Sequence, residues 1–140
     1  ENYYLVADSA RHGLTHYRVD KMSHITATGE PRAVTEASRR LDPAAYSRSV
    51  FSMYGGAVQR VRMRFHQSLA GVVVDRFGRD AILAPDGPDF FTCTFEIAVS
   101  PVFLGWMASF GDKAEILFPA SVREQLRQLL SASLAQYAAK

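Results

Sequence analysis

Apolar and polar residues alternate most regularly in two segments of the second half of the chain. In the first, Val61, Met63 and Phe65 alternate with three arginines. In the second, apolar side chains stand at every other position from Phe91 to Val99, with mostly polar residues between them. Successive side chains of a strand point to opposite faces. Both segments therefore predict strands with one buried and one exposed face.

Apolar residues at helical spacing predict three helices in the same half of the chain. The first spans Leu69–Phe77, and Gly78 is well placed to end it. The second begins at Ser100-Pro101, because serine is a good N-cap and proline fits the first helical position. The third has Ser121 and Glu124 at the spacing of a capping box.

Short strands at Ala81–Pro85 and Ala114–Phe118 complete the order β-α-β-β-α-β from Val58 onward, and one helix follows. This is the split βαβ order of ferredoxin-like domains. In that arrangement the first and third strands are central neighbours, and the two helices cover one face of the sheet. We therefore predict an α+β protein with a ferredoxin-like βαββαβ domain and an extra C-terminal helix at residues 58–140.

The first residues predict a β-hairpin, because turn-prone residues separate two strand-like segments, Tyr3–Ala7 and His16–Met22. We expect Leu5, Tyr17 and Val19 to point inward. The alternation then places a phenol, an imidazole and a guanidinium together on the outer face, which suits an anionic ligand. The residues expected on this outer patch are Tyr4, His16 and Arg18.

A weaker alternation at His24–Thr28 predicts a third strand. Residues 32–57 are expected to form a connector, with a short helix that Asp42-Pro43 begins. Gly55-Gly56 at its end is the natural hinge.

Composition and charge narrow the class of protein. Hydrophobic residues make up 48% of the chain and charged residues 21%, as in a globular protein. No apolar run approaches the ~20 residues needed to span a bilayer. The single cysteine excludes a disulfide framework and fits a reducing cytoplasm. The net charge of +2 hides an asymmetry, because residues 11–64 hold ten Lys/Arg against four Asp/Glu. This excess points to an anionic partner.

Two groups of cations are candidates for holding that partner. The first is the hairpin patch, to which we add Lys21; the alternative is that Arg18 simply pairs with Asp20. The second is a stripe of arginines on one strand face, whose alternative role is a solvated surface with an ion pair to Glu96. We expect no aromatic residue on that face, which argues against base stacking. The second group comprises Arg60, Arg62, Arg64 and, at the end of the first helix, Arg76.

The sequence does not indicate catalysis, metal binding or cofactor binding. The chain has no nucleophile elbow, no phosphate-binding glycine loop and no convincing pair of carboxylates. Its histidines lack metal-ligand spacing. We therefore expect no enzyme activity, no metal and no cofactor.

Several short motifs resemble those of WYL-domain transcriptional regulators of bacteria. Tyr3-Tyr4-Leu5 is similar to the Trp-Tyr-Leu that names the family, and Tyr17–Met22 to its aromatic-Arg-x-Asp-Arg-Ile segment, with Lys21 in place of arginine. This lysine keeps the charge but lacks the bidentate geometry of a guanidinium. Landmarks of the extension that follows the domain are Phe51–Gly55, Asp75–Gly78 and Phe110–Asp112.

The resemblance implies a fold and a role. Such regulators carry a winged helix-turn-helix, then a WYL domain with an SH3-like (Sm-like) barrel, then the C-terminal extension. Residues 1–31 would be the C-terminal part of the WYL domain, and residues 58–140 the extension. We expect the chain to be a fragment of such a regulator, with its promoter-binding domain outside it. The WYL domain is regarded as a sensor of ligands such as nucleotides or single-stranded DNA.

These observations predict the ligand-sensing and dimerisation region of a bacterial transcriptional regulator. We expect a cytoplasmic homodimer that binds an anionic nucleotide or single-stranded nucleic acid, and that contacts no membrane. Ligand binding would favour one arrangement about the Gly55-Gly56 hinge. Two alternatives stay open: a module that only dimerises, and an effector domain for a small metabolite.

Overall fold

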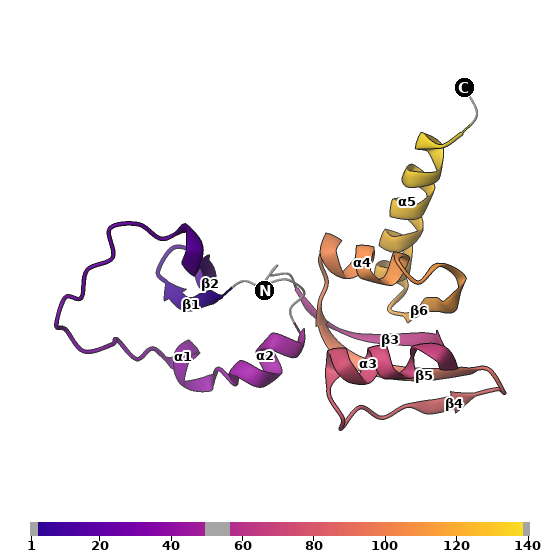
Figure 1. Ribbon diagram of the computed structural model, residues 1–140, viewed down its shortest axis with the longest axis horizontal. Helices are drawn as coiled ribbons and strands as arrows, with labels where there is room; N and C mark the ends of the chain where they lie inside the picture. Colours follow the sequence, from indigo (N-terminus) through magenta and orange to yellow (C-terminus); the bar gives the residue numbers. More distant parts are fainter. Residues whose placement is uncertain (1–2, 50–56, 139–140) are drawn as a thin grey trace. The chain divides into compact units, whose positions relative to one another are not determined.

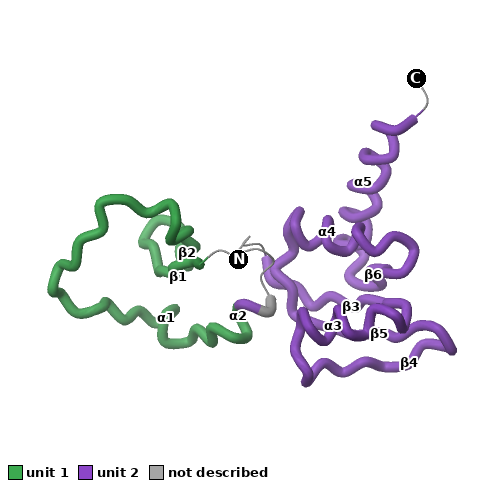
Figure 2. Tube along the Cα trace, viewed as in Figure 1, with its two compact units in different colours: residues 1–46 green, residues 47–140 purple. Residues whose placement is uncertain are grey.

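The computed structural model describes residues 3–49 and 57–138 (Figure 1). The chain divides into two compact units, residues 1–46 and 47–140 (Figure 2). The finer division into three segments stays a prediction, and the Gly55-Gly56 hinge and the Phe51–Gly55 motif lie outside the described residues. None of the described helices is long and apolar enough to cross a membrane.

The larger unit is built on a four-stranded sheet. Its strands are β3 (Val58–His66), β4 (Ala84–Asp86), β5 (Phe90–Ala98) and β6 (Ala114–Phe118). They lie in the order β4-β5-β3-β6, and all neighbours are antiparallel. The first and third strands of the unit are therefore the central pair, as in a ferredoxin-like domain. The α+β prediction is confirmed.

Helices α3 (Ala70–Phe77) and α4 (Pro101–Ala108) pack against one face of this sheet, which we call the covered face, and their apolar side chains form the core with those of the strands. The inward residues of β3 are fully buried against them. Phe77 of α3 stacks on Phe95 of β5, with ring centroids 4.0 Å apart. The alternation in the sequence therefore identified the covered face correctly. The buried residues of β3 are Val61, Met63 and Phe65.

Local signals in the sequence determine where α4 begins and where α3 ends. The Ser100 hydroxyl accepts a hydrogen bond from the Phe103 amide at 3.2 Å, and Pro101 follows as the first helical residue. Gly78 ends α3 with φ of 101°, a conformation that favours glycine. Both boundaries agree with the prediction. Short 3₁₀ turns, η2 (Gln67–Leu69) and η3 (Gly111–Lys113), precede α3 and β6.

Helix α5 (Ala120–Gln136) follows β6 and begins differently from the prediction. Pro119 is its N-cap, and no side chain caps the first turn. The predicted capping box is wrong, because Ser121 and Glu124 both lie inside the helix. Glu124 instead accepts hydrogen bonds from Arg127 and Gln128, and these bonds lower the pKa of Glu124 to about 2.

The two edges of the sheet differ in construction. At one edge, the Arg123 guanidinium on α5 donates a 2.8 Å hydrogen bond to the backbone carbonyl of Ile116 in β6. It also pairs with Glu115 of the same strand. At the other edge, β4 has three residues, and its central residue is Pro85.

The smaller unit begins with the predicted hairpin. Strands β1 (Tyr4–Ser9) and β2 (Gly13–Arg18) pair antiparallel, with Tyr4 opposite Arg18. The second strand ends earlier than predicted, because a 3₁₀ turn, η1 (Val19–Lys21), follows it. The third strand predicted at His24–Thr28 is wrong, since this segment has no regular secondary structure. The SH3-like barrel stays a prediction, because the described part of this unit contains a two-stranded sheet.

Two short helices complete the smaller unit and the connector. Helix α2 (Pro43–Ser49) confirms the predicted start, because the Asp42 carboxylate accepts hydrogen bonds from the amides of its first turn. Helix α1 (Glu36–Arg40) was not predicted. Thr35 and Ser38 cap it reciprocally, each side chain accepting from the other residue's amide.

Candidate anion-binding surfaces

The face of the four-stranded sheet opposite α3 and α4, which we call the open face, carries the arginine stripe. Arg62 lies directly opposite Thr94 in the register between β3 and β5, and Arg64 lies opposite Thr92. A shallow cavity of about 410 Å³ lies on this face, and both guanidinium and hydroxyl side chains line it. The lining residues that matter here are Arg60, Arg62, Thr92 and Thr94.

Two of the arginines have no partner within residues 3–49 and 57–138. Neither Arg60 nor Arg62 forms an ion pair or a side-chain hydrogen bond there. Glu96 lies opposite Arg60 in the register, yet the two do not form the ion pair that we considered as an alternative role. Two adjacent cations on an exposed face therefore keep their full capacity to donate hydrogen bonds.

Arg64, the third residue of the stripe, has a structural role. Its Nε donates a 2.6 Å hydrogen bond to Oδ2 of Asp86 in β4. Its guanidinium lies 3.8 Å from the centre of the Phe90 ring. Phe90 is an aromatic residue on the open face, where we expected none, but Arg64 covers its ring. Arg64 thus links β3 to the β4–β5 hairpin, and the stripe reduces to Arg60 and Arg62.

Arg76 does not join the stripe. It lies in α3, on the other side of the sheet, with its guanidinium 5.4 Å from the centre of the Phe77 ring. Burial lowers the pKa of Arg76. The structure therefore separates Arg76 from Arg60 and Arg62, with which we had grouped it.

The hairpin patch in the smaller unit is less open than predicted. Leu5 and Tyr17, which we expected to point inward, are 50% and 43% exposed. Tyr4 and His16, which we expected on the outside, are half-buried on the other face of the hairpin. The assignment of inner and outer faces was therefore wrong.

Helix α2 explains part of this reversal. The Nε2 atom of His16 lies 2.5 Å from the hydroxyl oxygen of Tyr46, and the two rings are also in contact. Partial burial raises the pKa of Tyr46. His16 is thus engaged by a residue thirty positions later in the chain.

Arg18 pairs with Asp20, as the alternative interpretation held. Its Nε and Nη2 atoms donate to the two carboxylate oxygens at 3.0 and 2.7 Å. These hydrogen bonds raise the pKa of Arg18 and lower that of Asp20. Lys21 is exposed in η1. An anion at this patch would have to compete with a carboxylate that already holds Arg18.

The remaining chemistry-bearing residues belong to the core or are scattered. Cys93 is 3% exposed, and burial raises the pKa of its thiol to about 12. Trp106 packs among phenylalanine rings. Across the residues that the structure describes, no three His, Cys, Asp or Glu side chains are grouped to hold a metal ion.

Residues 57–134 match the family model of the WCX domain. The match covers more than half of the chain, and the chain therefore belongs to the WCX domain family. This family is the WYL-associated C-terminal domain, so the resemblance to the extension of WYL-type regulators is confirmed over residues 57–134.

A solved structure and the curated proteins complete the comparison. The chain is similar to proteasome accessory factor B/C (PafBC) of Arthrobacter aurescens, at 20% sequence identity and a TM-score of 0.49. That match covers 99% of this chain and 21% of the other, so this chain spans about a fifth of the length of that protein. No curated protein matches the chain.

Proposed function

We propose that this chain is the ligand-sensing and dimerisation region of a bacterial transcriptional regulator. An anionic ligand, either a nucleotide or a single-stranded nucleic acid, binds it and controls a separate helix-turn-helix domain. Membership of the WCX domain family supports the regulatory role. The observation that supports an anionic ligand is the pair Arg60 and Arg62 on the open face, which have no partner among the described residues.

The spacing of this pair favours a phosphate backbone. Residues two apart on one strand lie about 6.6 Å apart, so the two guanidiniums can each hold one phosphate of an extended chain. The exposed Thr94 lies opposite Arg62 across the strand pair, and its hydroxyl can donate to the same oxygens. Phe90 is occupied by Arg64, which leaves it unsuited to stacking on a base. The open face therefore favours phosphates over bases.

The hairpin patch is the second candidate for the same ligand. Tyr4, His16, Arg18 and Lys21 provide donors of the right kind, but Arg18 is bound to Asp20 and His16 to Tyr46. A ligand would gain less binding free energy at the hairpin, because each new hydrogen bond replaces an existing one. We therefore assign the main contacts to Arg60 and Arg62.

The double substitution of Arg60 and Arg62 with alanine tests the proposed site. We expect the affinity for a short oligothymidylate, measured by fluorescence anisotropy, to fall by about tenfold or more. Loss of two phosphate contacts should also reduce the slope of log K against log salt by roughly 1.4. Nucleotide binding is measured in parallel with a fluorescent nucleoside triphosphate.

The matched control is Arg39→Ala, which removes an exposed arginine of α1. It should leave both affinity and salt slope nearly unchanged. Unchanged binding in the Arg60→Ala/Arg62→Ala variant would show that the open face is not the ligand site. A stable dimer that binds none of these anions in its wild-type form would instead favour the module that only dimerises.

A further inference from the structure

The cavity on the open face has an apolar end, which the arginine pair does not explain. Its lining includes Ile82, which lies just before β4 and is 83% exposed, and Ala84 of β4. Leu83, between these two residues, packs against the core instead. This alternation places Ile82 on the open face. A single exposed isoleucine is common on a protein surface, but this one lines the same cavity as Arg60 and Arg62.

The register of the strands puts the lining groups in order across the sheet. Arg62 of β3 lies opposite Thr94 of β5. Ala84 lies opposite Thr92, and the same register carried two residues further places Ile82 level with Thr94. Because neighbouring strands lie about 4.8 Å apart, the chain at Ile82 is about 10 Å from the chain at Arg62, with Thr94 between them. The cavity is therefore cationic at β3, carries a hydroxyl at β5 and is apolar on the side of β4.

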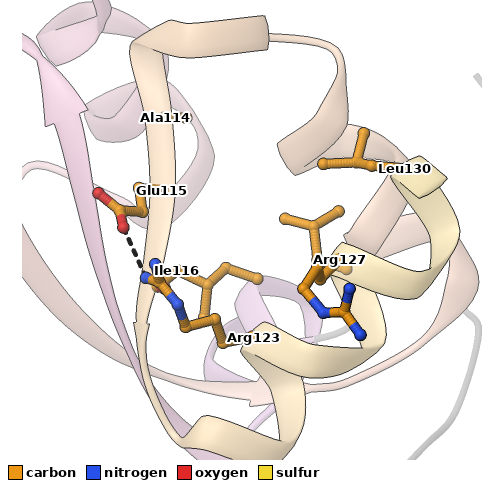
Figure 3. A pocket seen from close by; sticks show the side chains of 7 residues that line it. Ala114, Glu115, Ile116, Arg123, Arg127 and Leu130 are labelled. Carbon is orange, nitrogen blue, oxygen red and sulfur yellow. Dashed lines mark hydrogen bonds and ion pairs between the residues drawn. The ribbon is translucent and has the colours of Figure 1, made fainter. Parts of the chain in front are cut away.

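Another cavity of the same unit lacks this combination. It has a volume of about 210 Å³ and lies between β6 and α5 (Figure 3). Two arginines line it as well, but Arg123 pairs with Glu115, and Arg127 pairs with Glu124. An anion with an apolar group would have to displace a carboxylate there. On the open face the arginines beside the apolar end have no partner among the described residues.

We infer that the open-face cavity holds a nucleotide that lies across the strands. Its phosphate binds Arg60 and Arg62. A hydroxyl of its sugar bonds to Thr94, and its base packs against Ile82. Phosphate, sugar and base follow one another in a nucleotide in the same order as the cations, the hydroxyl and the apolar group in the cavity. The inference rests on the proposed function and adds the residue that receives the base.

The contact with the base is aliphatic, and such a contact has no preferred direction. Ile82 therefore favours the presence of a base without distinguishing one base from another. Adenosine and thymidine monophosphates should bind with affinities within about threefold of each other.

The substitution Ile82→Ser tests the contact with the base. Affinities are measured on the 140-residue chain by displacement of a fluorescent nucleoside triphosphate. Adenosine monophosphate and ribose 5-phosphate share the phosphate and the sugar, so they differ at the base. We expect the wild-type chain to bind adenosine monophosphate about tenfold more tightly, because the base covers an exposed isoleucine. Ile82→Ser should remove this difference and leave the affinity for ribose 5-phosphate unchanged.

The matched control is Ile25→Ser. Ile25 belongs to the smaller unit, is 75% exposed and does not line the cavity. This variant should bind both compounds as the wild-type chain does. A third competitor, geranyl phosphate, has an apolar chain and no sugar. Stronger displacement by geranyl phosphate than by adenosine monophosphate would overturn the assignment of a nucleotide.

The outcomes separate this inference from the proposed function. The inference is wrong if Arg60→Ala/Arg62→Ala weakens binding of the triphosphate while Ile82→Ser keeps the preference for adenosine monophosphate. The open face would then remain the ligand site. An equal loss of affinity for both competitors in Ile82→Ser would also overturn it, because Ile82 would then support the surface without contacting the base. If the double arginine variant binds the triphosphate as the wild type does, the proposed site and the inference fail together.

Discussion

The two faces of β3 carry side chains of opposite kinds within one strand. Met63 and Phe65 are completely buried in the core, whereas Arg62, one position before Met63, lies on the open face without a partner among the described residues. Because neighbouring positions point in opposite directions, a substitution affects the core or the surface but not both. Substitutions on the open face of such a strand should therefore have little effect on its fold.

The hairpin of the smaller unit differs from β3 in this respect. Its half-buried face holds Tyr4 and His16, which we had also considered for ligand binding. Arg18 is held by Asp20, and His16 contacts Tyr46. The two regions therefore differ in how far their cations are already paired. The number of cations in a segment does not reveal whether neighbouring residues already occupy their hydrogen-bond donors.

The largest effect is expected on the covered face. Phe65→Ala removes a completely buried ring that contacts three other aromatic rings. It should lower the free energy of unfolding by about 3–5 kcal/mol, measured by urea denaturation. The matched substitution on the open face, Arg62→Ala, should change it by less than about 0.5 kcal/mol. Similar losses for both variants would contradict the separation of the two faces.

The reactivity of a thiol on each face of β5 allows the two faces of the sheet to be compared. Cys93 points into the core, and its pKa of about 12 keeps the thiol protonated at pH 8. Thr94→Cys places a thiol on the open face, where its pKa should lie near 8.5. We expect the new cysteine to react with a disulfide reagent at least about a hundredfold faster than Cys93, because Cys93 can react only after the core opens locally. Rapid labelling of the wild-type chain would show that the core is more open than described.

The smallest effect is expected at the hairpin. Asp20→Asn removes the carboxylate that pairs with Arg18 and so raises the net positive charge of the hairpin by one. If the ligand binds the open face of the sheet, oligothymidylate affinity should change by less than about twofold, because Arg60 and Arg62 are unchanged and salt screens a single exposed charge. A clear gain in affinity that Arg18→Ala abolishes would move the ligand site to the hairpin.

The larger unit was predictable because its signals are local and regular. Alternation from Arg60 to Phe65 in β3 and from Phe91 to Ile97 in β5 leaves one choice of buried face. Ser100-Pro101 and Gly78 set helix ends through interactions within a few residues. The order of elements then left the ferredoxin-like topology as the simplest arrangement.

The predictions failed where residues distant in the sequence determine which side chains are buried or paired. The inner face of the hairpin depends in part on Tyr46, which the sequence near His16 does not reveal. The role of Arg64 depends on Asp86 and Phe90, and these come near it only through strand pairing. Asp86 stands beside the turn-prone residues Gly87-Pro88. This signal could have indicated a short hairpin between β4 and β5, which brings the carboxylate near the arginines of β3.

The construction of the sheet edges has a consequence for assembly. An unpaired edge strand invites another chain to extend the sheet, which leads to strand exchange and aggregation. At β6, Arg123 occupies the carbonyl of Ile116 that an incoming strand would need. At β4, Pro85 has no amide hydrogen to offer, and three residues give little to pair with. Both features disfavour the pairing of a further strand with the described sheet, and so oppose edge-to-edge polymerisation of copies of this domain.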